Sequence, residues 1–337
     1  MDNVKLLDCT LRDGAYVVDF EFGKSNIIKI INTLIKSNVE YIECGFLGEN
    51  NNPNKVLFNN LGELYDTIPQ YPENIKFALM LNFADKNKFD FESDINLKYK
   101  NRICIRIAFF KNERMNALEF TSYLKKLGYN VFLQMMVTHM YTENELLDYI
   151  NRVNEVSPYC LSLVDSFGTF YNSDIERYFN VINNNMNDTI LFGFHSHNNI
   201  QMAYSNCVKF IELANNSRNI IIDSTVYGMG RGAGNCPTDL IMSYLNSENK
   251  RYNITEIFDI YEFNLKQIHE TNYWGYSIEY LLTAQLGINP AYIWYLQKKN
   301  IKSLYLISKI LNLIPEDSKH YLNVKFIDYA LDKEHNG

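Results

Sequence analysis

Two histidines one residue apart, His195 and His197, lie in the segment 194–199 (FHSHNN), directly after a run of apolar residues. In an extended chain, residues i and i+2 point to the same side, so both imidazoles can face one point. Two neutral imidazoles and one carboxylate form a ligand set that binds a divalent metal and leaves positions open for a substrate. The alternative is one histidine in the core and one on the surface, because an HxH pair alone is a weak motif.

A carboxylate that could join these histidines lies near the N-terminus, in the segment 8–14 (DCTLRDG). This segment follows another apolar run and holds Asp8, Arg12 and Asp13, which are two carboxylates and a guanidinium. It could also be a polar loop that ends in an Asp-Gly turn. In a (β/α)8 barrel, reactive groups lie at the carboxyl ends of the strands. Histidines at one strand end and a carboxylate at another therefore favour a shared metal site.

A glycine-rich segment, 227–237 (YGMGRGAGNCP), follows the last predicted strand. Four of the seven residues from 228 to 234 are glycine, and glycine lets the backbone approach a ligand closely. The segment could equally be a flexible surface loop, or a phosphate site of the kind that often follows the seventh and eighth barrel strands. Asn235 has a side-chain carbonyl that could complete the coordination of a metal.

Glu43 is an acid inside the apolar segment 40–46 (EYIECGF). An isolated buried charge is costly, so this carboxylate is expected to be paired or to face the barrel mouth. Arg12 is a candidate partner, and the pair could serve either structure or catalysis.

Eight short apolar runs alternate with amphipathic stretches, which is typical of a parallel sheet covered by helices. Eight such units predict a closed (β/α)8 barrel. An open doubly wound sheet is the alternative, but no GxGxxG motif follows the first strand. The predicted strands are 4–9, 40–46, 75–81, 103–109, 130–136, 160–164, 190–195 and 219–225, the predicted helices are 24–37, 58–67, 114–127, 143–156, 172–185, 200–215 and 237–247, and the polar stretch 84–99 is only weakly helical.

Beyond residue 250 the alternation stops, and one helical pattern follows another. No flexible linker precedes this part, so we predict a catalytic barrel over residues 1–250 and a helical C-terminal extension over residues 251–337 that packs on it. Helices are expected at 254–270, 277–287, 291–298, 303–313 and 322–331, with breaks at Pro290 and Pro315.

Composition limits the class of protein. A chain of 337 residues with 47% hydrophobic residues can form one large core, and a net charge of −7 without an arginine-rich tract argues against a nucleic-acid partner. The N-terminus does not resemble a signal peptide, and no segment approaches the ~20 apolar residues of a membrane span. The six cysteines include no CxxC pair and suit small core positions in a reducing compartment. We therefore expect a cytoplasmic protein without a membrane partner.

Four motifs, in this order, resemble those of the DRE-TIM metallolyases, a superfamily that includes hydroxymethylglutaryl-CoA lyase, isopropylmalate and homocitrate synthases and 4-hydroxy-2-oxovalerate aldolase. They are 8–14 (DCTLRDG), 42–46 (IECGF), 195–198 (HSHN) and 228–235 (GMGRGAGN), and the resemblance covers roughly residues 4–240. The aldolase branch is the most similar, on the segments 135–140 (MMVTHM) and 164–168 (VDSFG) and, more loosely, on 274–280 (WGYSIEY).

The resemblance implies a role for each matching residue. Arg12 would hold the developing enolate oxygen, and Glu43 would orient Arg12 or a metal-bound water. Tyr276 or Tyr280 would donate a proton. The implied metal ligands are Asp13, His195, His197 and Asn235, for Mg²⁺ or Mn²⁺, and the implied substrate contacts are Arg12, Thr10, Ser166 and Gly230.

One position departs from the aldolase pattern. That branch has a histidine base shortly after its Arg-Asp-Gly, where this chain has Tyr16. A tyrosine, with a pKa near ~10, is a poor base at neutral pH, so Tyr16 and His139 are both candidates for the base. The C-terminal part does not match the region by which that aldolase docks a dehydrogenase, and no such partner is predicted.

The resemblance implies a metal-dependent aldolase that forms or cleaves a carbon–carbon bond next to a 2-oxo acid such as pyruvate, with an aldehyde as the second substrate. Two alternatives are open. One is Claisen condensation of an acyl-CoA with a 2-oxo acid, which would need a basic groove for the CoA phosphates that the sequence does not show. The other is a barrel without catalysis that binds or regulates. The aromatic C-terminal helices would suit a homodimer contact.

Overall fold

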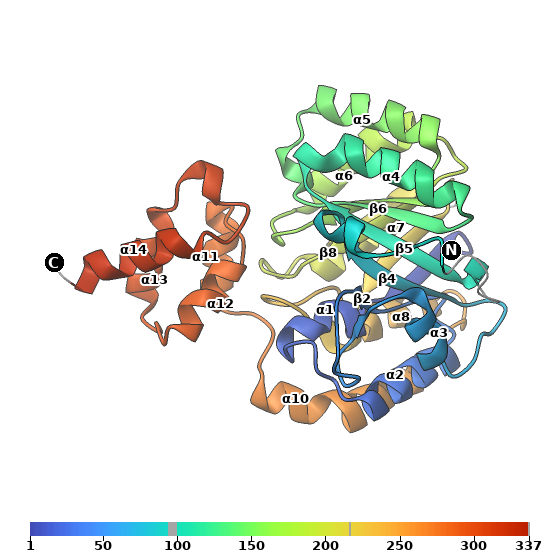
Figure 1. The fold of residues 1–337 in the computed structure, drawn as a ribbon. Coiled ribbons are helices and arrows are strands. Elements are labelled where there is room, and N and C mark those ends of the chain that lie inside the picture. Colours follow the sequence, from blue (N-terminus) through green and yellow to red (C-terminus); the bar gives the residue numbers. More distant parts are fainter. Residues whose placement is uncertain (94–99, 216, 336–337) are drawn as a thin grey trace.

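Parallel strands close into an eight-membered ring in the computed structural model, which describes residues 1–93, 100–215 and 217–335 (Figure 1). The strand order is β1-β9-β8-β7-β6-β5-β4-β2, and the pairing of β1 with β2 closes the ring. The (β/α)8 barrel expected from the sequence is confirmed, and the open sheet is excluded. The strands are β1 (Val4–Asp8), β2 (Tyr41–Leu47), β4 (Lys76–Asn82), β5 (Ile103–Phe109), β6 (Asn130–Met135), β7 (Cys160–Asp165), β8 (Leu191–Ser196) and β9 (Ile220–Ser224).

A further short strand, β3 (Leu57–Phe58), pairs with β2 outside the ring and was not expected. It approaches β2 at Gly45, where the register of β2 against β4 shifts. A Cβ on Gly45 would lie 2.2 Å from the carbonyl oxygen of Val56, and the φ of Gly45 is +145°. Glycine is therefore required here on both steric and conformational grounds. This irregularity directly follows Glu43, the acid that the sequence singled out.

Helices cover the outside of the ring, and α5 shows why the sequence forms them. Thr142 and Glu145 make a capping box at its start, and Leu146, Tyr149 and Val153 bury one face of it against the strands. The outer helices are α2 (Lys24–Lys36), α3 (Leu61–Thr67), α4 (Arg114–Lys126), α5 (Glu143–Val156), α6 (Asn172–Asn185), α7 (Ala203–Ala214) and α8 (Thr238–Asn246). Of the polar stretch 84–99, residues 94–99 lie outside the described residues, and the rest begins in the 3-10 helix Phe83–Lys88.

The C-terminal part is helical, as expected, and it divides between two hydrophobic cores. Ile257, Ile260 and Trp274 pack into the core of the barrel, whereas residues from Ile288 onward form a cluster of their own. We propose that the two parts of the chain meet after Trp274 rather than at residue 250. The helices are α9 (Ile254–Ile260), α10 (Lys266–Thr271), α11 (Ile278–Leu286), α12 (Ala291–Lys298), α13 (Leu304–Asn312) and α14 (Val324–His335), with a π-helical turn, Tyr261–Leu265, between α9 and α10.

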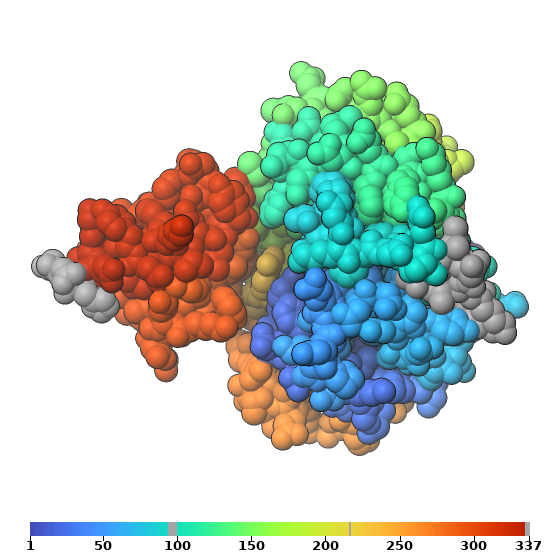
Figure 2. Space-filling view, viewed as in Figure 1, coloured from blue at the N-terminus to red at the C-terminus, as the bar shows by residue number. Residues whose placement is uncertain are grey.

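Helices α11–α14 form a C-terminal lobe that stands opposite the carboxyl ends of the barrel strands (Figure 1). In the space-filling view the lobe meets the barrel along a groove (Figure 2). Asn289 and His320 of this lobe line the same cavity as residues from the strand ends. The lobe therefore covers the face of the barrel on which reactive groups are expected.

The opposite end of the barrel interior is apolar. Tyr41, Phe132 and Ile221 belong to a small cluster that fills it, together with cysteines 9, 104 and 160. All six cysteines are free and buried, which confirms their expected place as small core residues. Among the described residues, the helices are too short or too polar to cross a membrane.

Candidate active site

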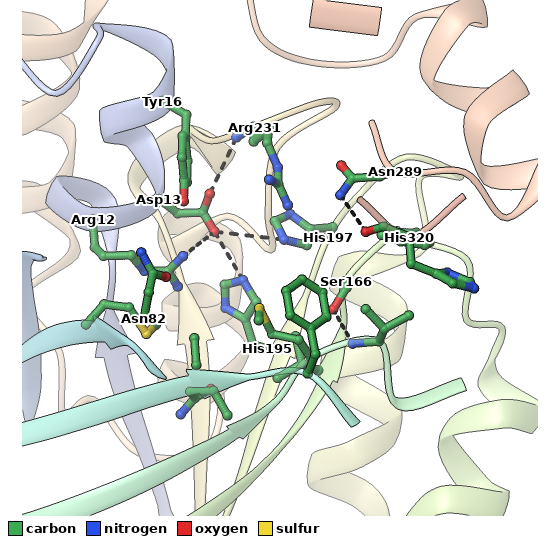
Figure 3. A pocket seen from close by; sticks show the side chains of 18 of the residues that line it. Arg12, Asp13, Tyr16, Asn82, Ser166, His195, His197, Arg231, Asn289 and His320 are labelled. Atoms are coloured by element: carbon green, nitrogen blue, oxygen red, sulfur yellow. Dashed lines mark hydrogen bonds and ion pairs between the residues drawn. The ribbon is translucent and has the colours of Figure 1, made fainter. Parts of the chain in front are cut away.

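Asp13, His195 and His197 come together at the barrel mouth (Figure 3). Asp13 ends α1 (Thr10–Asp13), a single helical turn after β1, and the histidines lie at and just beyond the end of β8. Oδ2 of Asp13 lies 3.1 Å from Nε2 of His195 and 4.0 Å from Nε2 of His197. All three side chains are buried, and their ligand atoms lie within 4.8 Å of one another. This spacing suits one divalent cation.

Asn235 supplies a test of whether a cation fits. Its Oδ1 is buried and has no hydrogen-bond partner among the described residues, although its Nδ2 donates to the carbonyl of Met229 at 3.2 Å. Asn235 also forms an isolated β-bridge with His197, which holds the glycine segment beside β8. An orphaned buried carbonyl next to two imidazoles and a carboxylate fits a metal ligand set of oxygen and nitrogen.

The protonation of the cluster also suits a cation. Burial lowers the pKa of His197 to about 3, against the opposing effect of Asp13, so this imidazole is neutral at neutral pH. Burial alone would raise the pKa of Asp13, but the charge of the Arg12 guanidinium and the hydrogen bond with His195 hold that pKa well below its usual range. A neutral imidazole and an ionised carboxylate are the forms that bind a metal.

Buried charges continue from this cluster into the barrel. Oε2 of Glu43 accepts a hydrogen bond from Nε of Arg12 at 2.8 Å and another from Nη1 of Arg106 at 2.7 Å. Nη2 of Arg106 in turn donates to Oδ2 of Asp223, and that same oxygen lies 3.0 Å from Nδ1 of His195. Arg12 also donates from Nη1 to Asp13 at 2.9 Å. The network links Arg12, the residue expected to hold the enolate, with the candidate metal ligands. Each charged side chain in it contacts one of opposite charge.

Arg106 and Asp223 were missed in the sequence. Both are fully buried charges inside otherwise apolar strands, β5 (ICIRIAF) and β9 (IIIDS). The same signal, a charged residue within an apolar run, had singled out Glu43, and it could have found these two as well.

The cluster opens into a cavity of about 130 Å³. Of the residues singled out in the sequence, those that line it are Arg12, Asp13, Tyr16, Ser166, His195 and His197. The cavity also contacts Gln134 of β6 and, from the C-terminal lobe, Asn289 and His320. Its size fits a small molecule rather than a polymer.

Of the other residues named for substrate contact, Ser166 lines this cavity, whereas Thr10 and Gly230 do not. The Ser166 hydroxyl accepts a hydrogen bond from the backbone N–H of Val137 at 2.8 Å. Thr10 is buried and accepts from the N–H of Val226 at 2.8 Å, so it fixes the loop after β9 and does not line the cavity. Gly230 borders a neighbouring, larger cavity, and a Cβ there would lie 2.0 Å from Nδ2 of Asn235.

The four aromatic candidates for proton transfer are spread apart. Tyr16 lines the cavity with its hydroxyl on the side of Asp13, and burial raises the pKa of that hydroxyl (Figure 3). The ring of His139 packs 5.4 Å from that of Phe167 and lies outside the cavity lining. Tyr280 borders the larger cavity, and Tyr276 borders neither.

A parallel barrel with a candidate metal-binding cluster at its mouth limits the class of protein, and a family model narrows it further. The chain belongs to the HMGL-like family, whose model matches residues 92–268, more than half of the chain. The resemblance inferred from the four motifs is thereby confirmed.

Several named proteins are similar to this chain. One is "oxaloacetate decarboxylase" of Mycobacterium tuberculosis, 25% identical over 245 residues, which are 71% of this chain and 69% of that protein. Another is "4-hydroxy-2-oxovalerate aldolase" of Geobacillus genomosp. 3, 25% identical over 249 residues, which are 72% of this chain and 70% of the relative.

Solved structures share the fold. The N-terminal domain of a putative aldolase from Bacteroides vulgatus has a TM-score of 0.74 and 23% identity, with 92% of this chain and all of that chain covered. The HMG-CoA lyase of Bacillus subtilis has a TM-score of 0.62 and 14% identity, with coverage of 84% and 97%.

Proposed function

We propose that this protein is a divalent-metal-dependent aldolase that forms or cleaves the carbon–carbon bond next to a 2-oxo acid such as pyruvate. The observation that carries the proposal is the meeting of Asp13, His195 and His197 beside a small cavity lined by Arg12. The family and the relatives named as aldolase and decarboxylase support an enzyme of the carbon–carbon lyase class. A barrel without catalysis is correspondingly less favoured.

Asp13, His195 and His197 would hold the cation, with Asn235 as a further ligand, and we propose Mg²⁺ or Mn²⁺ because both accept an oxygen–nitrogen ligand set. When bound there, a divalent cation supplies Lewis-acid stabilisation of negative charge on the oxygens of the 2-oxo acid. The chain itself does the rest: it binds the substrate, orients it and moves the protons.

Arg12 is placed to stabilise the enolate. Its Nε donates to Glu43 and its Nη1 to Asp13, which fixes the plane of the guanidinium and leaves Nη2 for the substrate. In the cleavage direction, a base removes the hydroxyl proton of the 4-hydroxy-2-oxo acid and the bond between C3 and C4 breaks. The electron pair passes to the enolate of the 2-oxo acid, and the aldehyde leaves. Arg12 offers a fixed cation where that charge develops, a preorganised arrangement.

Tyr16 is the aromatic candidate best placed for proton transfer, because it lines the cavity on the side of Asp13. Its raised pKa favours the protonated hydroxyl. In the direction of synthesis, Tyr16 would therefore donate a proton to the oxygen of the aldehyde as the new bond forms. The Ser166 hydroxyl would bind the carboxylate of the 2-oxo acid.

Location and assembly are further proposals. Six buried free cysteines suit a reducing cytoplasm. Exposed aromatic side chains in the C-terminal part, such as Phe263, Tyr305 and Tyr329, would suit a homodimer contact.

The proposal is tested by measuring whether the protein forms the enolate of pyruvate when no aldehyde is present. Protein stripped of metal and then loaded with Mn²⁺ or Mg²⁺ is incubated with pyruvate in D₂O, and exchange of the C3 protons is followed by NMR. We expect exchange with metal, and a loss of about 100-fold or more in Asp13→Asn. Arg152→Met, at an exposed arginine outside the cavity, is the control and should keep the wild-type rate. Absence of exchange with either metal would sink the proposal. Thiol release from an acyl-CoA in the presence of a 2-oxo acid would favour condensation instead.

A further inference from the structure

A second cavity, of about 660 Å³, adjoins the first one between the barrel loops and the C-terminal lobe. On the barrel side it is lined by Phe20 and Gly230, and on the lobe side by Tyr280, Trp294 and Lys298. Two residues, Tyr16 and Arg231, line both cavities and so mark the passage from one to the other. A substrate held beside Asp13 could therefore extend past them into the larger space.

Arg231 is held in this passage by its backbone. Its N–H points to Oδ1 of Asp13 at 3.5 Å, and its carbonyl accepts a hydrogen bond from the N–H of Gly234 at 3.2 Å. The side chain turns into the cavity above His197 (Figure 3), and its guanidinium carbon lies 5.3 Å from the centre of the Tyr16 ring. The guanidinium thus stands a short distance from the candidate metal ligands.

The guanidinium of Arg231 has no acidic partner in the part of the chain that the structure describes. Arg12 and Arg106 each have a carboxylate within 3 Å, but no carboxylate among the described residues lies within ion-pair distance of the Arg231 guanidinium. A half-buried guanidinium without an acid beside it is a receptor for an anion, because its planar fork matches a carboxylate or a phosphate.

The wall of the larger cavity also carries more cations than acids. Lys298 lies over the ring of Trp294, 3.9 Å from its centre. Asp19 is the one acid among the lining residues, against the two cations Arg231 and Lys298. Aromatic rings make up much of the rest of the wall. Such a surface suits a ligand with an apolar segment and a negatively charged end.

We propose that this passage is the subsite of the second substrate, that this substrate is an aldehyde carrying a carboxylate or a phosphate, and that Arg231 binds its anionic group. The inference rests on the proposed aldolase function and names the substrate class of that site. It makes Arg231 the residue that sets specificity, whereas Asp13, His195 and His197 serve the 2-oxo acid.

The experiment compares matched aldehydes in the direction of synthesis with pyruvate and Mn²⁺. The pairs are succinic semialdehyde against butanal, and glyceraldehyde 3-phosphate against glyceraldehyde, which separate the carboxylate from the phosphate. We expect a higher kcat/KM for at least one charged member by about 10-fold or more, and in Arg231→Met this ratio should fall toward one, a loss of roughly 10- to 100-fold. Lys302→Met, an exposed cation of the same lobe, should keep the wild-type ratio.

Binding of unreactive analogues provides a second measurement that does not depend on turnover. Calorimetry should show that 4-hydroxybutyrate or glycerol 3-phosphate binds the wild type more tightly than Arg231→Met, and that butan-1-ol and glycerol show no such difference. If pyruvate exchange is absent but this difference is found, the proposed function fails and the subsite stands. If exchange is present but the wild type does not favour charged ligands, the inference is wrong. It is also wrong if Arg231→Met raises the KM for pyruvate and leaves the aldehyde ratio unchanged.

Discussion

Nδ1 of His195 lies 3.0 Å from Oδ2 of Asp223, at the base of the candidate active site. An ionised carboxylate accepts hydrogen bonds but has no proton to donate, and the pKa of Asp223 lies below its usual value. Burial would raise this pKa, but the charge of Arg106 and the bond from His195 outweigh it. Nδ1 of His195 therefore donates its proton to Asp223, while Nε2 faces Oδ2 of Asp13 at 3.1 Å, on the side from which it would bind a cation. Burial lowers the pKa of His195, but its hydrogen bonds with Asp13 and Asp223 outweigh burial and raise that pKa. Carboxylates behind ligating histidines commonly fix the tautomer in this way.

We expect Asp223→Asn to weaken metal binding without removing a proposed ligand. An amide at this position can offer Nδ1 a donor as well as an acceptor, so the orientation and basicity of His195 are no longer fixed. The dissociation constant for Mn²⁺, measured by competition with a chelator, should rise by about 10- to 100-fold. Asp8→Asn, which changes another buried acid of the barrel, should leave it within about threefold of the wild type. An unchanged Mn²⁺ affinity in Asp223→Asn would contradict the role.

Arg106→Met should destabilise the barrel strongly. The guanidinium of Arg106 is fully buried and bonds to both Glu43 and Asp223, so its removal leaves two buried carboxylates with one partner fewer each. Loss of one member of a buried ionic network typically lowers the free energy of unfolding by about 3–5 kcal/mol. Urea denaturation followed by circular dichroism measures this. Arg152→Met, at an exposed arginine, should change the free energy of unfolding by less than about 0.5 kcal/mol, and an equally small effect at Arg106 would refute the argument.

Gly230→Ala should lower the metal affinity while the fold is retained. The added Cβ would lie 2.0 Å from Nδ2 of Asn235, so the Asn235 side chain or the loop must shift. Since Nδ2 and Oδ1 move together, the proposed carbonyl ligand moves too. We expect a metal affinity about 10-fold or more below that of the wild type. In Gly48→Ala the Cβ would meet only the flexible Leu57 side chain, whose nearest atom lies at 3.3 Å, and the affinity should be retained. Equal metal affinities in the two variants would count against Asn235 as a ligand.

The stability of the protein should depend on the ionisation of Asp8. Burial raises the pKa of Asp8 from 3.8 to about 6, although hydrogen bonds from Thr238 and Thr10 act against the shift. Between these two pH values the folded protein binds a proton that the unfolded chain has lost. The free energy of unfolding should therefore fall as the pH rises through this window, by up to about 3 kcal/mol.

Asp8→Asn isolates this contribution, because the amide does not titrate. Urea denaturation at pH 4.5 and at pH 7.5 should show a larger loss of stability in the wild type than in the variant over this interval. Parallel pH profiles for the two proteins would mean that Asp8 titrates normally in the folded state.

The sequence predicts those features of the structure that depend on local residue patterns. Strand and helix positions follow from the alternation of apolar and amphipathic runs, and the family, the barrel and the class of enzyme are confirmed. The short β3 was missed because two residues carry no periodicity. Arg106 and Asp223 each stand as a charge within an apolar run, which is a local signal, but their pairing across 117 residues of the chain is not visible in the sequence. The roles of the lobe residues Asn289, His320 and Lys298 could not be foreseen, since they depend on how the lobe sits over the barrel.

That lobe has an apolar centre of its own, built around Tyr292, Ile310 and Ile327. Its surface can therefore accept substitutions during evolution without disturbing the strands that carry Asp13 and His195. Descendants of one ancestral enzyme could thus inherit the bond-breaking chemistry and, with Arg231, the anion site of the barrel, and still diverge in the length and shape of the aldehydes they accept. The cavity residues Trp294 and Lys298 belong to the lobe, which folds around a different centre.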